Sequence, residues 1–154
     1  MTQGIRLALF QPDIAPNVGA IIRLAACMGV SLDIVEPCGF PFSMHKVRRQ
    51  VMDYGDKADI KRHDSWLRYQ EDRVPGRLLA MTTHGAACLW DFQFQPADTL
   101  LMGQESAGLP EEVHAIADAR LVIPMATGTR SLNIAIAAGM AVAEAVRQLR
   151  AERH

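Results

Sequence analysis

The stretch from residue 100 to residue 145 constrains the fold most, because two short apolar segments in it each lead into a polar or Gly-rich loop and then into a helix-forming segment. In an open α/β sheet, ligands bind where the carboxyl ends of strands meet the starts of helices. Gly103 and Gly108 allow backbone to approach a ligand closely. Ser131 and Asn133 supply oxygens beside the free N–H groups of a helix start. The stretch therefore predicts a small-molecule site.

Strand-like and helix-like patterns alternate along the whole chain. Short apolar runs predict strands at residues 5–10, 31–35, 58–62, 78–81, 99–102 and 121–123. Helical spacing and helix-end residues predict one helix that begins at Asn17 and stops at Gly29, and others at residues 44–51, 65–71, 110–116 and 132–150. This alternation indicates an α/β fold with a mainly parallel sheet and helices on both faces. With 49% hydrophobic residues, the 154 residues suffice for one domain, residues 1–154.

The first and last helices carry further information. Asn17 is expected to be the N-cap of the first, because an Asn side chain accepts hydrogen bonds from the free N–H groups there. The last helix has a surface of small residues around Gly139, and a glycine inside a helix costs about 1 kcal/mol relative to alanine. Close packing of another backbone would offset that cost. Two arrangements stay open here: packing inside the monomer core, or an interface between two copies.

Net charge, cysteine pattern and the longest apolar run limit which compartments and partners are compatible with the sequence. A net charge of -1 gives no sign of a polyanion partner, so a nucleic-acid surface would have to be a local patch. The three cysteines form no CxxC pair, which argues against a disulfide framework or a zinc site. The longest apolar run, residues 134–143, is half of the about 20 residues that a membrane span needs. We expect a cytoplasmic protein without metal or membrane association.

Several residue patterns exclude common sites. The sequence has no GxGxxG and no GxxxxGK[ST], so it supports neither a dinucleotide site, nor a P-loop, nor the Gly-rich fingerprint of Rossmann-type methyltransferases. Four of the five histidines, His45, His63, His84 and His114, show no metal-ligand spacing, and we expect them on the surface. Glu105 lies between two loop glycines, which turn chemistry explains poorly. A function for that loop is favoured over a simple strand-to-helix turn.

Three motifs in this order resemble those of the SPOUT RNA methyltransferases. They are PDIAPNVGAIIRLA with Asn17, Gly19 and Arg23, then LLMGQESAGLP, then LVIPMATGTRSLN. With its short length and no added RNA-binding domain, the chain is most similar to the tRNA wobble-position 2′-O-methyltransferases, which act on cytidine or uridine. Segments shared with that group are EPCGF at 36–40, RR at 48–49, DY at 53–54 and MTT at 81–83. The resemblance covers nearly the whole chain.

The resemblance implies a fold, a cofactor and a donor site. It implies a deep trefoil knot near the C-terminus, a homodimer, and S-adenosylmethionine as the methyl donor for a tRNA ribose 2′-hydroxyl, with the wobble nucleotide as the expected target. The donor would be held mainly by backbone. The donor-site residues implied are Met81, Thr82, Gly103, Glu105, Gly108, Leu109, Ile123, Met125, Ser131 and Leu132.

The same resemblance implies catalytic and RNA-binding residues. The implied catalytic residues are Asn17, Arg23, Ser131 and Asn133, and the implied tRNA contacts are Lys46, Arg48, Arg49 and Arg130. A guanidinium is effectively always protonated, so we expect Arg23 to orient the hydroxyl and neutralise the adjacent phosphate. A salt-bridged structural arginine is the alternative for Arg23, and a solvated charged face is the alternative for the basic run.

The sequence departs from the family pattern at two positions. Gln104 stands where relatives usually have proline, which affects the rigidity of its loop, and Ala135 stands where many have serine, which removes a hydroxyl from the expected site. Two other functions therefore stay open. One is methylation of a different RNA site, since the fold fixes the donor more firmly than the acceptor. The other is an RNA-binding module that has lost catalysis, for which the alanine at 135 is the best argument.

Overall fold

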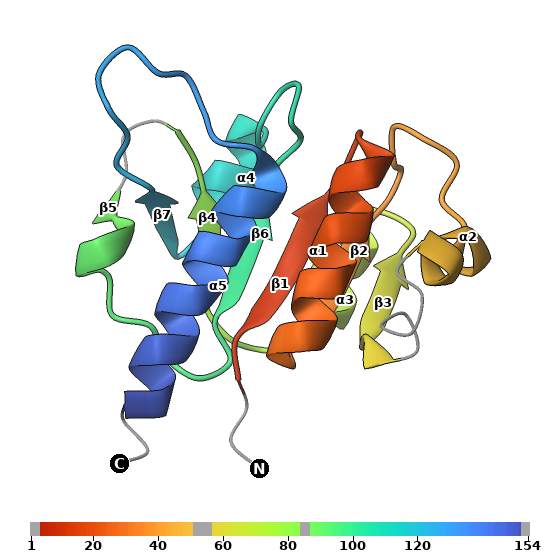
Figure 1. Ribbon diagram of the computed structural model, residues 1–154, viewed down its shortest axis with the longest axis horizontal. Helices are drawn as coiled ribbons and strands as arrows, with labels where there is room; N and C mark the ends of the chain where they lie inside the picture. The colour runs from red at the N-terminus through yellow and green to blue at the C-terminus, as the bar shows by residue number, and fades with distance from the viewer. Residues whose placement is uncertain (1–3, 51–56, 84–86, 152–154) are drawn as a thin grey trace.

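The computed structural model of the chain describes residues 4–50, 57–83 and 87–151 (Figure 1). Its strands are β1 (Arg6–Phe10), β2 (Ser31–Val35), β3 (Ile60–His63), β4 (Leu78–Met81), β5 (Ala87–Cys88), β6 (Thr99–Met102) and β7 (Ala119–Val122). Its helices are α1 (Ala15–Met28), α2 (Met44–Gln50), α3 (Trp66–Asp72), α4 (Glu111–Ile116) and α5 (Ile134–Ala151), with a 3₁₀ turn at Leu89–Asp91. The strands form one sheet in the order β3-β2-β1-β6-β4-β7-β5. Every pair of neighbouring strands in it is parallel.

Helices cover both faces of this sheet, as the alternating pattern predicts. Helices α1 and α5 lie side by side on one face and pack against each other (Figure 1). Their buried side chains join alternate residues of the strands, such as Leu7 and Leu9 of β1, in the larger core. The residue between them, Ala8, belongs to a second core on the opposite face, with Tyr69 of α3 and Val113 of α4. The strands β1, β2, β4 and β6 are therefore buried on both sides, which explains their continuous apolar runs.

A buried polar cluster lies beneath α3 and corrects one expectation. His63 is 3% exposed, although its sequence context predicts a surface position. Its Nε2 lies 2.8 Å from Asp33 Oδ1, and the Arg6 guanidinium donates to Asp33 Oδ2 at 3.2 Å. The Tyr69 ring meets the His63 ring edge-on, with centroids 5.0 Å apart. The histidine is buried because a carboxylate on the neighbouring strand accepts its hydrogen bond, a long-range partner that sequence spacing does not reveal.

The predicted elements exist, with shifted ends. The expected strands at 58–62 and 121–123 run over Ile60–His63 and Ala119–Val122, and the last helix begins two residues later than expected. The two-residue strand β5 and the 3₁₀ turn were not predicted, because such short pieces show no periodicity. The C-terminal trefoil knot stays a prediction. Asp53, Tyr54 and His84, which were part of the sequence argument, lie outside the described residues.

The expectation that Asn17 caps the first helix is wrong. Helix α1 begins at Ala15, and Ile14 occupies the N-cap position without a side-chain cap. Pro16 lies in the first turn, where its fixed φ and missing N–H suit a helix start. Asn17 therefore falls inside the helix, and its side chain is available for contacts outside α1. Within the described residues, none of the helices has the length and apolarity to cross a membrane.

Candidate functional site: a cavity at the carboxyl edge of the sheet

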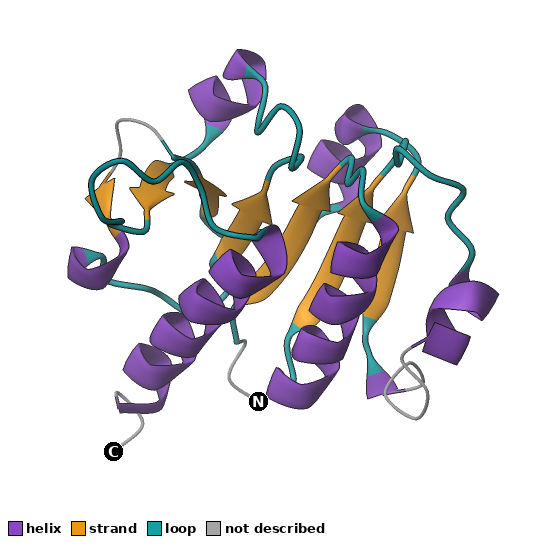
Figure 2. Cartoon of the chain, turned by 45° about the horizontal axis from the view of Figure 1, so that its top comes forward, coloured by secondary structure: helices purple, strands orange, loops and turns teal. Residues whose placement is uncertain are grey.

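The strand order creates a crevice at the carboxyl edge. β6 and β7 lie on either side of β4, so the carboxyl ends of these three strands meet at one place along this edge. Figure 2 shows the strand-end loops and the starts of α1 and α5 gathered at this edge. A cavity of about 780 Å³ opens there, lined by residues from the ends of β4, β6 and β7 and from the starts of α1 and α5. Its volume is that of a typical small-molecule site.

Residues 103–109, the donor loop, form one wall of the cavity. The loop folds back on itself: Gly108 N donates to Gln104 O at 2.9 Å, and Gln104 N donates to Gly108 O at 3.2 Å. A Cβ on Gly103 would lie 2.6 Å from the carbonyl carbon of Gly108 and 2.8 Å from the amide N of Leu109. Gly108 itself has a φ of 67°, which favours glycine. Gly103 is thus required because the backbone of the loop itself leaves no room for a side chain. From the sequence, we expected this glycine to leave room for a ligand instead.

Gln104 ties the donor loop to the segment after β1. Its Nε2 donates to the backbone carbonyl of Gln11 at 3.0 Å. Gln11 has a φ of 43°, an uncommon left-handed conformation for a residue with a side chain. This hydrogen bond supplies a link to the loop that a proline at 104 would not make.

A chain of side-chain hydrogen bonds joins the three sequence motifs. Asn17 Nδ2 donates to Glu105 Oε1 at 3.0 Å, and Asn133 Nδ2 donates to Asn17 Oδ1 at 3.1 Å. Asn133 Oδ1 in turn accepts from Ala135 N at 2.9 Å, so Asn133 caps the start of α5. The first motif, the donor loop and the last motif are thereby held in one geometry, although their residues lie 88 and 116 positions apart.

Two neighbouring carboxyl groups at this wall of the cavity have shifted pKa values. Burial, followed by the neighbouring Asp13 side chain, raises the pKa of Glu105. The Glu105 side chain is the main cause that lowers the pKa of Asp13 to about 2. Glu105 Oε2 is buried, and among the described residues it has no hydrogen-bond partner. The opposite shifts make Asp13 the more acidic of the two groups.

All ten residues implied as donor-binding line the cavity. They are Met81, Thr82, Gly103, Glu105, Gly108, Leu109, Ile123, Met125, Ser131 and Leu132. Of the residues implied as catalytic, Asn17, Ser131 and Asn133 line it as well, whereas Arg23 does not. Arg23 is exposed on α1, six residues after Asn17. The geometry thus brings together every expected member of the site except the arginine.

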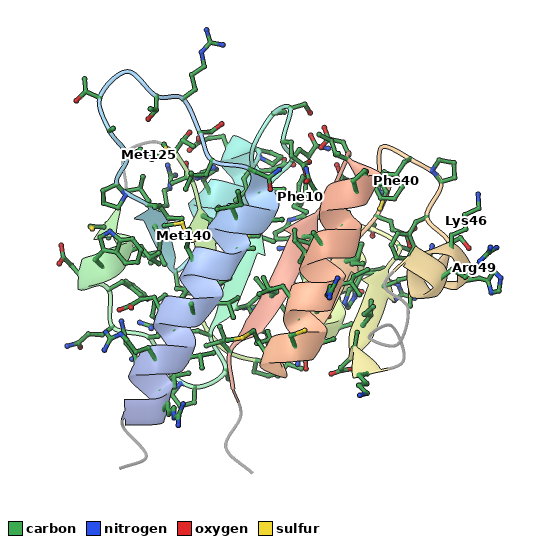
Figure 3. All side chains as sticks on the ribbon, viewed as in Figure 1. Phe10, Phe40, Lys46, Arg49, Met125 and Met140 are labelled. Atoms are coloured by element: carbon green, nitrogen blue, oxygen red, sulfur yellow. The ribbon has the colours of Figure 1, made fainter. Side chains whose placement is uncertain are left out.

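The residues implied as RNA-binding lie apart from the cavity lining. Lys46 and Arg49 are on α2, at the β3 end of the sheet, and their side chains point away from the body of the protein (Figure 3). The side chain of Arg48 is outside the described set. Arg130 is exposed in the loop before α5. The basic positions therefore lie on two separate elements, α2 and the loop before α5.

Part of the cavity lining was not predicted from the sequence. Glu111, His114 and Arg120 line the cavity from α4 and β7, with the Arg120 guanidinium 3.2 Å from a Glu111 carboxylate oxygen. His114 Nδ1 is buried and has no partner among the described residues, so His114 is not the surface histidine expected. Within residues 4–50, 57–83 and 87–151, no group of three or more potential ligands could hold a metal ion. These cavity residues were missed because short helices show little periodicity.

Comparison with known proteins gives this geometry a family. Residues 4–143 match the SpoU rRNA Methylase family. The tRNA (cytidine(34)-2′-O)-methyltransferase of Ancylobacter novellus is 51% identical over 146 residues, which cover 94% of this chain and 92% of that protein. The corresponding enzyme of Escherichia coli K12 is 37% identical, covering 94% of each chain. The chain belongs to the SpoU methylase family.

Solved structures agree with this assignment. A structure that addresses 2′-OH methylation of C/U34 on tRNA superimposes with a TM-score of 0.90 at 41% identity, covering 97% of this chain and 98% of that one. The SpoU methyltransferase AviRb from Streptomyces viridochromogenes, solved in complex with its cofactor AdoMet, gives a TM-score of 0.82 at 28% identity. It covers 98% of this chain and 62% of AviRb.

Proposed function

We infer that this protein transfers a methyl group from S-adenosylmethionine to the ribose 2′-hydroxyl of nucleotide 34 in a tRNA, with cytidine or uridine as the base. The observation that carries the inference is the hydrogen-bonded chain Glu105–Asn17–Asn133, which unites three motifs at a cavity of ligand size. Relatives at 37% to 51% identity that cover nearly the whole chain have this activity in their names. The named relatives support the acceptor, and the cavity supports the donor site.

The cavity residues suit a donor that is both apolar and charged. Met81, Ile123 and Met125 offer apolar surface, while the backbone of the donor loop offers N–H and carbonyl groups. The partly buried Glu105 and His114 side chains add polar groups to the cavity lining. When bound, S-adenosylmethionine supplies a methyl group on a positively charged sulfur. The residues of the chain then align donor and ribose, and such alignment lowers the barrier by making the reaction effectively intramolecular.

The acceptor side of the site involves Arg23 and the start of α5. We infer that Asn17, Ser131 and Asn133 contact the ribose or its phosphate, because they line the cavity beside the start of α5. Arg23 is outside the cavity lining of its own subunit, which supports its action on the site of a second subunit. There it would orient the 2′-hydroxyl and neutralise the adjacent phosphate. Lys46, Arg48, Arg49 and Arg130 would bind tRNA phosphates further from the reacting ribose.

We further infer a homodimer that uses the outer surfaces of α1 and α5. Ala138, Ala141 and Ala145 are fully buried within the monomer, so that part of the small-residue surface packs in the core. On the outer surface of α5, a Cβ on Gly139 would meet nothing within 4 Å, and Ile136 is 56% exposed. Ile14 and Met28 add exposed apolar surface on α1. An apolar patch of this kind on neighbouring helices suits a two-fold interface.

Replacing Ile136 with arginine is expected to split the dimer, because the charge would have to be buried without a partner at the interface. Light scattering at micromolar concentration should give twice the 16.9 kDa chain mass for the unchanged protein and the single mass for Ile136→Arg. Leu67→Arg is the matched control, since Leu67 is 64% exposed on α3, on the opposite face of the sheet. A monomer mass for the unchanged protein would contradict the dimer.

Labelled donor tests the proposed function against its two alternatives. We expect the purified protein to transfer the labelled methyl group to total tRNA that does not yet carry the methyl group this protein adds. We expect no transfer to ribosomal RNA. Label in ribosomal RNA alone would favour another RNA target. Donor binding without transfer to either RNA would favour the inactive RNA-binding module, for which Ala135 is the argument. We infer a cytoplasmic location as well, because tRNA is the substrate named for the relatives.

A further inference from the structure

The segment between β1 and α1 contacts the donor loop through one acidic side chain, Asp13. Asp13 Oδ1 accepts a hydrogen bond from the Glu105 amide N at 3.2 Å, and Oδ2 accepts one from the Ser106 hydroxyl. Both partners lie more than 90 positions further along the chain. Asp13 is not part of the cavity lining, so any effect it has on a bound molecule is transmitted by the donor loop.

Asp13 is held from behind by the loop that follows β2. Gly39 N donates to the carbonyl of Pro12 at 2.9 Å. A Cβ on Gly39 would lie 2.7 Å from Asp13 Cβ and 2.9 Å from Asp13 Cα. Real Cβ atoms do not approach other carbons so closely, so a side chain at 39 would push Asp13 toward or away from the donor loop. Asp13 is thus wedged between two loops, and its carboxylate has little freedom to move.

Asp13 also lies close enough to the Glu105 carboxyl group for the two to shift each other's pKa, downward for Asp13 and upward for Glu105. The side chain that bonds Glu105 from α1 is Asn17, which is neutral, as is Asn133 at the start of α5, which bonds Asn17. Ser106, on the donor loop itself, bonds Asp13 and is neutral too. Among these side chains, the negative charge near Glu105 is that of Asp13.

We propose that Asp13 is a positioning residue of the donor site: through the Glu105 amide and the Ser106 hydroxyl it fixes the donor loop in the shape that binds S-adenosylmethionine. The proposal rests on the proposed function, because it takes the cavity as the donor site. It assigns Asp13 no contact with donor or RNA. Its effect should therefore appear in donor affinity, and saturating donor should largely restore turnover.

Calorimetry with S-adenosylhomocysteine, the demethylated product, measures this effect directly. Asp13→Ala removes both bonds and should raise the dissociation constant about tenfold or more, since hydrogen bonds to a charged group are among the stronger ones. Asp13→Asn keeps an acceptor for the Glu105 amide and should raise it less. Gly39→Ala leaves Asp13 chemically unchanged but displaces it, and should weaken binding in the same direction. In transfer assays, each change should raise the donor KM and leave kcat within a few-fold.

Asp59→Asn is the matched control. Asp59 accepts a hydrogen bond from the Ser31 hydroxyl at 2.6 Å, an interaction of the same type beside the start of β2, far from the carboxyl edge. It should leave donor affinity unchanged. Unchanged affinity in folded Asp13→Ala and Gly39→Ala would overturn the positioning role while the unchanged protein still binds product. Absence of product binding by the unchanged protein would instead overturn the proposed function.

Carbon-13 NMR of the Glu105 carboxyl group measures the pKa of Glu105 as a second test. This pKa would not depend on Asp13 if Asp13 had only a structural role. Asp13 and burial both hold the pKa of Glu105 above its ordinary value. Asp13→Asn removes the facing charge, so the pKa of Glu105 should fall while burial still holds part of the increase. Asp59→Asn should leave it in place. The same Glu105 titration in Asp13→Asn as in the unchanged protein would contradict the close approach of Asp13 to Glu105 on which the positioning role depends.

Discussion

Replacing Arg23 with alanine should lower methyl transfer to tRNA by several orders of magnitude while S-adenosylmethionine affinity stays within a few-fold. Arg23 lies outside the cavity lining, so its loss leaves the donor contacts intact. A guanidinium that contacts the reacting ribose and its phosphate acts mainly in the transition state, and such losses appear in turnover. Single-turnover transfer of labelled methyl at saturating tRNA, together with calorimetry of donor binding, would measure both quantities.

Two further variants sharpen the Arg23 experiment. Arg23→Lys should restore little activity, because a point charge cannot reproduce the planar donor fork. Arg68→Ala is the matched control, since Arg68 is an exposed arginine on α3 that pairs with Glu71 at 3.5 Å. It should leave transfer unchanged. Near-normal transfer by Arg23→Ala would make this arginine structural and return the reaction to Asn17, Ser131 and Asn133.

Mixed dimers test whether Arg23 acts across the interface. One subunit would carry Arg23→Ala and the other Gly103→Val, which removes its donor site. If Arg23 serves the other subunit, the intact donor site in the mixed dimer is paired with the intact arginine of its partner, and the destroyed donor site with the mutated arginine. Activity near half of normal is then expected. Absence of activity would show that Arg23 acts within its own subunit.

Gly103→Val should abolish donor binding, with a loss of affinity of more than about 100-fold. The added side chain would meet the backbone of Gly108 and Leu109 at 2.6 Å and 2.8 Å, so the donor loop would have to open. Overpacking of this kind costs about 1 to 3 kcal/mol, and the cost is paid where the cavity wall is formed. Calorimetry with S-adenosylhomocysteine measures the affinity, and a thermal melt reports whether the domain stays folded.

Gly4→Val is the control for the Gly103 variant. A Cβ on Gly4 would meet nothing within 4 Å, and Gly4 lies before β1, away from the carboxyl edge. It should melt close to the unchanged protein and bind product normally. A folded Gly103→Val protein with unchanged affinity would remove the donor loop from the site and with it the assignment of the cavity.

Features with a local cause could be predicted from the sequence. The buried strands β1, β2, β4 and β6 read as apolar runs because both faces of the sheet are covered, and Gly29 stops α1 in the left-handed conformation. The glycines and polar residues after β6 and before α5, from which the sequence predicts a site, line the cavity. In each case the pattern reflects the environment of the residues that carry it.

Features that depend on distant partners could not be predicted. Asn17 has a side chain typical of a helix cap, but α1 begins earlier, with Pro16 in its first turn. The Asn17 side-chain amide instead donates a hydrogen bond to Glu105, 88 positions away. His63 is buried by an aspartate on another strand. Asp13 gave no signal as a partner of Glu105, since nothing in the sequence relates two carboxyls 92 positions apart. Such pairs become visible only when the parallel order brings β1 and β6 together.

The central claim is that the cavity delivers methyl to one ribose hydroxyl, that of nucleotide 34. The direct measurement compares two otherwise identical synthetic tRNAs, one with ribose and one with 2′-deoxyribose at position 34, incubated with the protein and labelled S-adenosylmethionine. Mass spectrometry of nuclease fragments then locates the methyl group. The account predicts a 2′-O-methyl group at position 34 of the first tRNA and none on the second. Equal labelling of both tRNAs, or a methyl group on a base or another ribose, would contradict it.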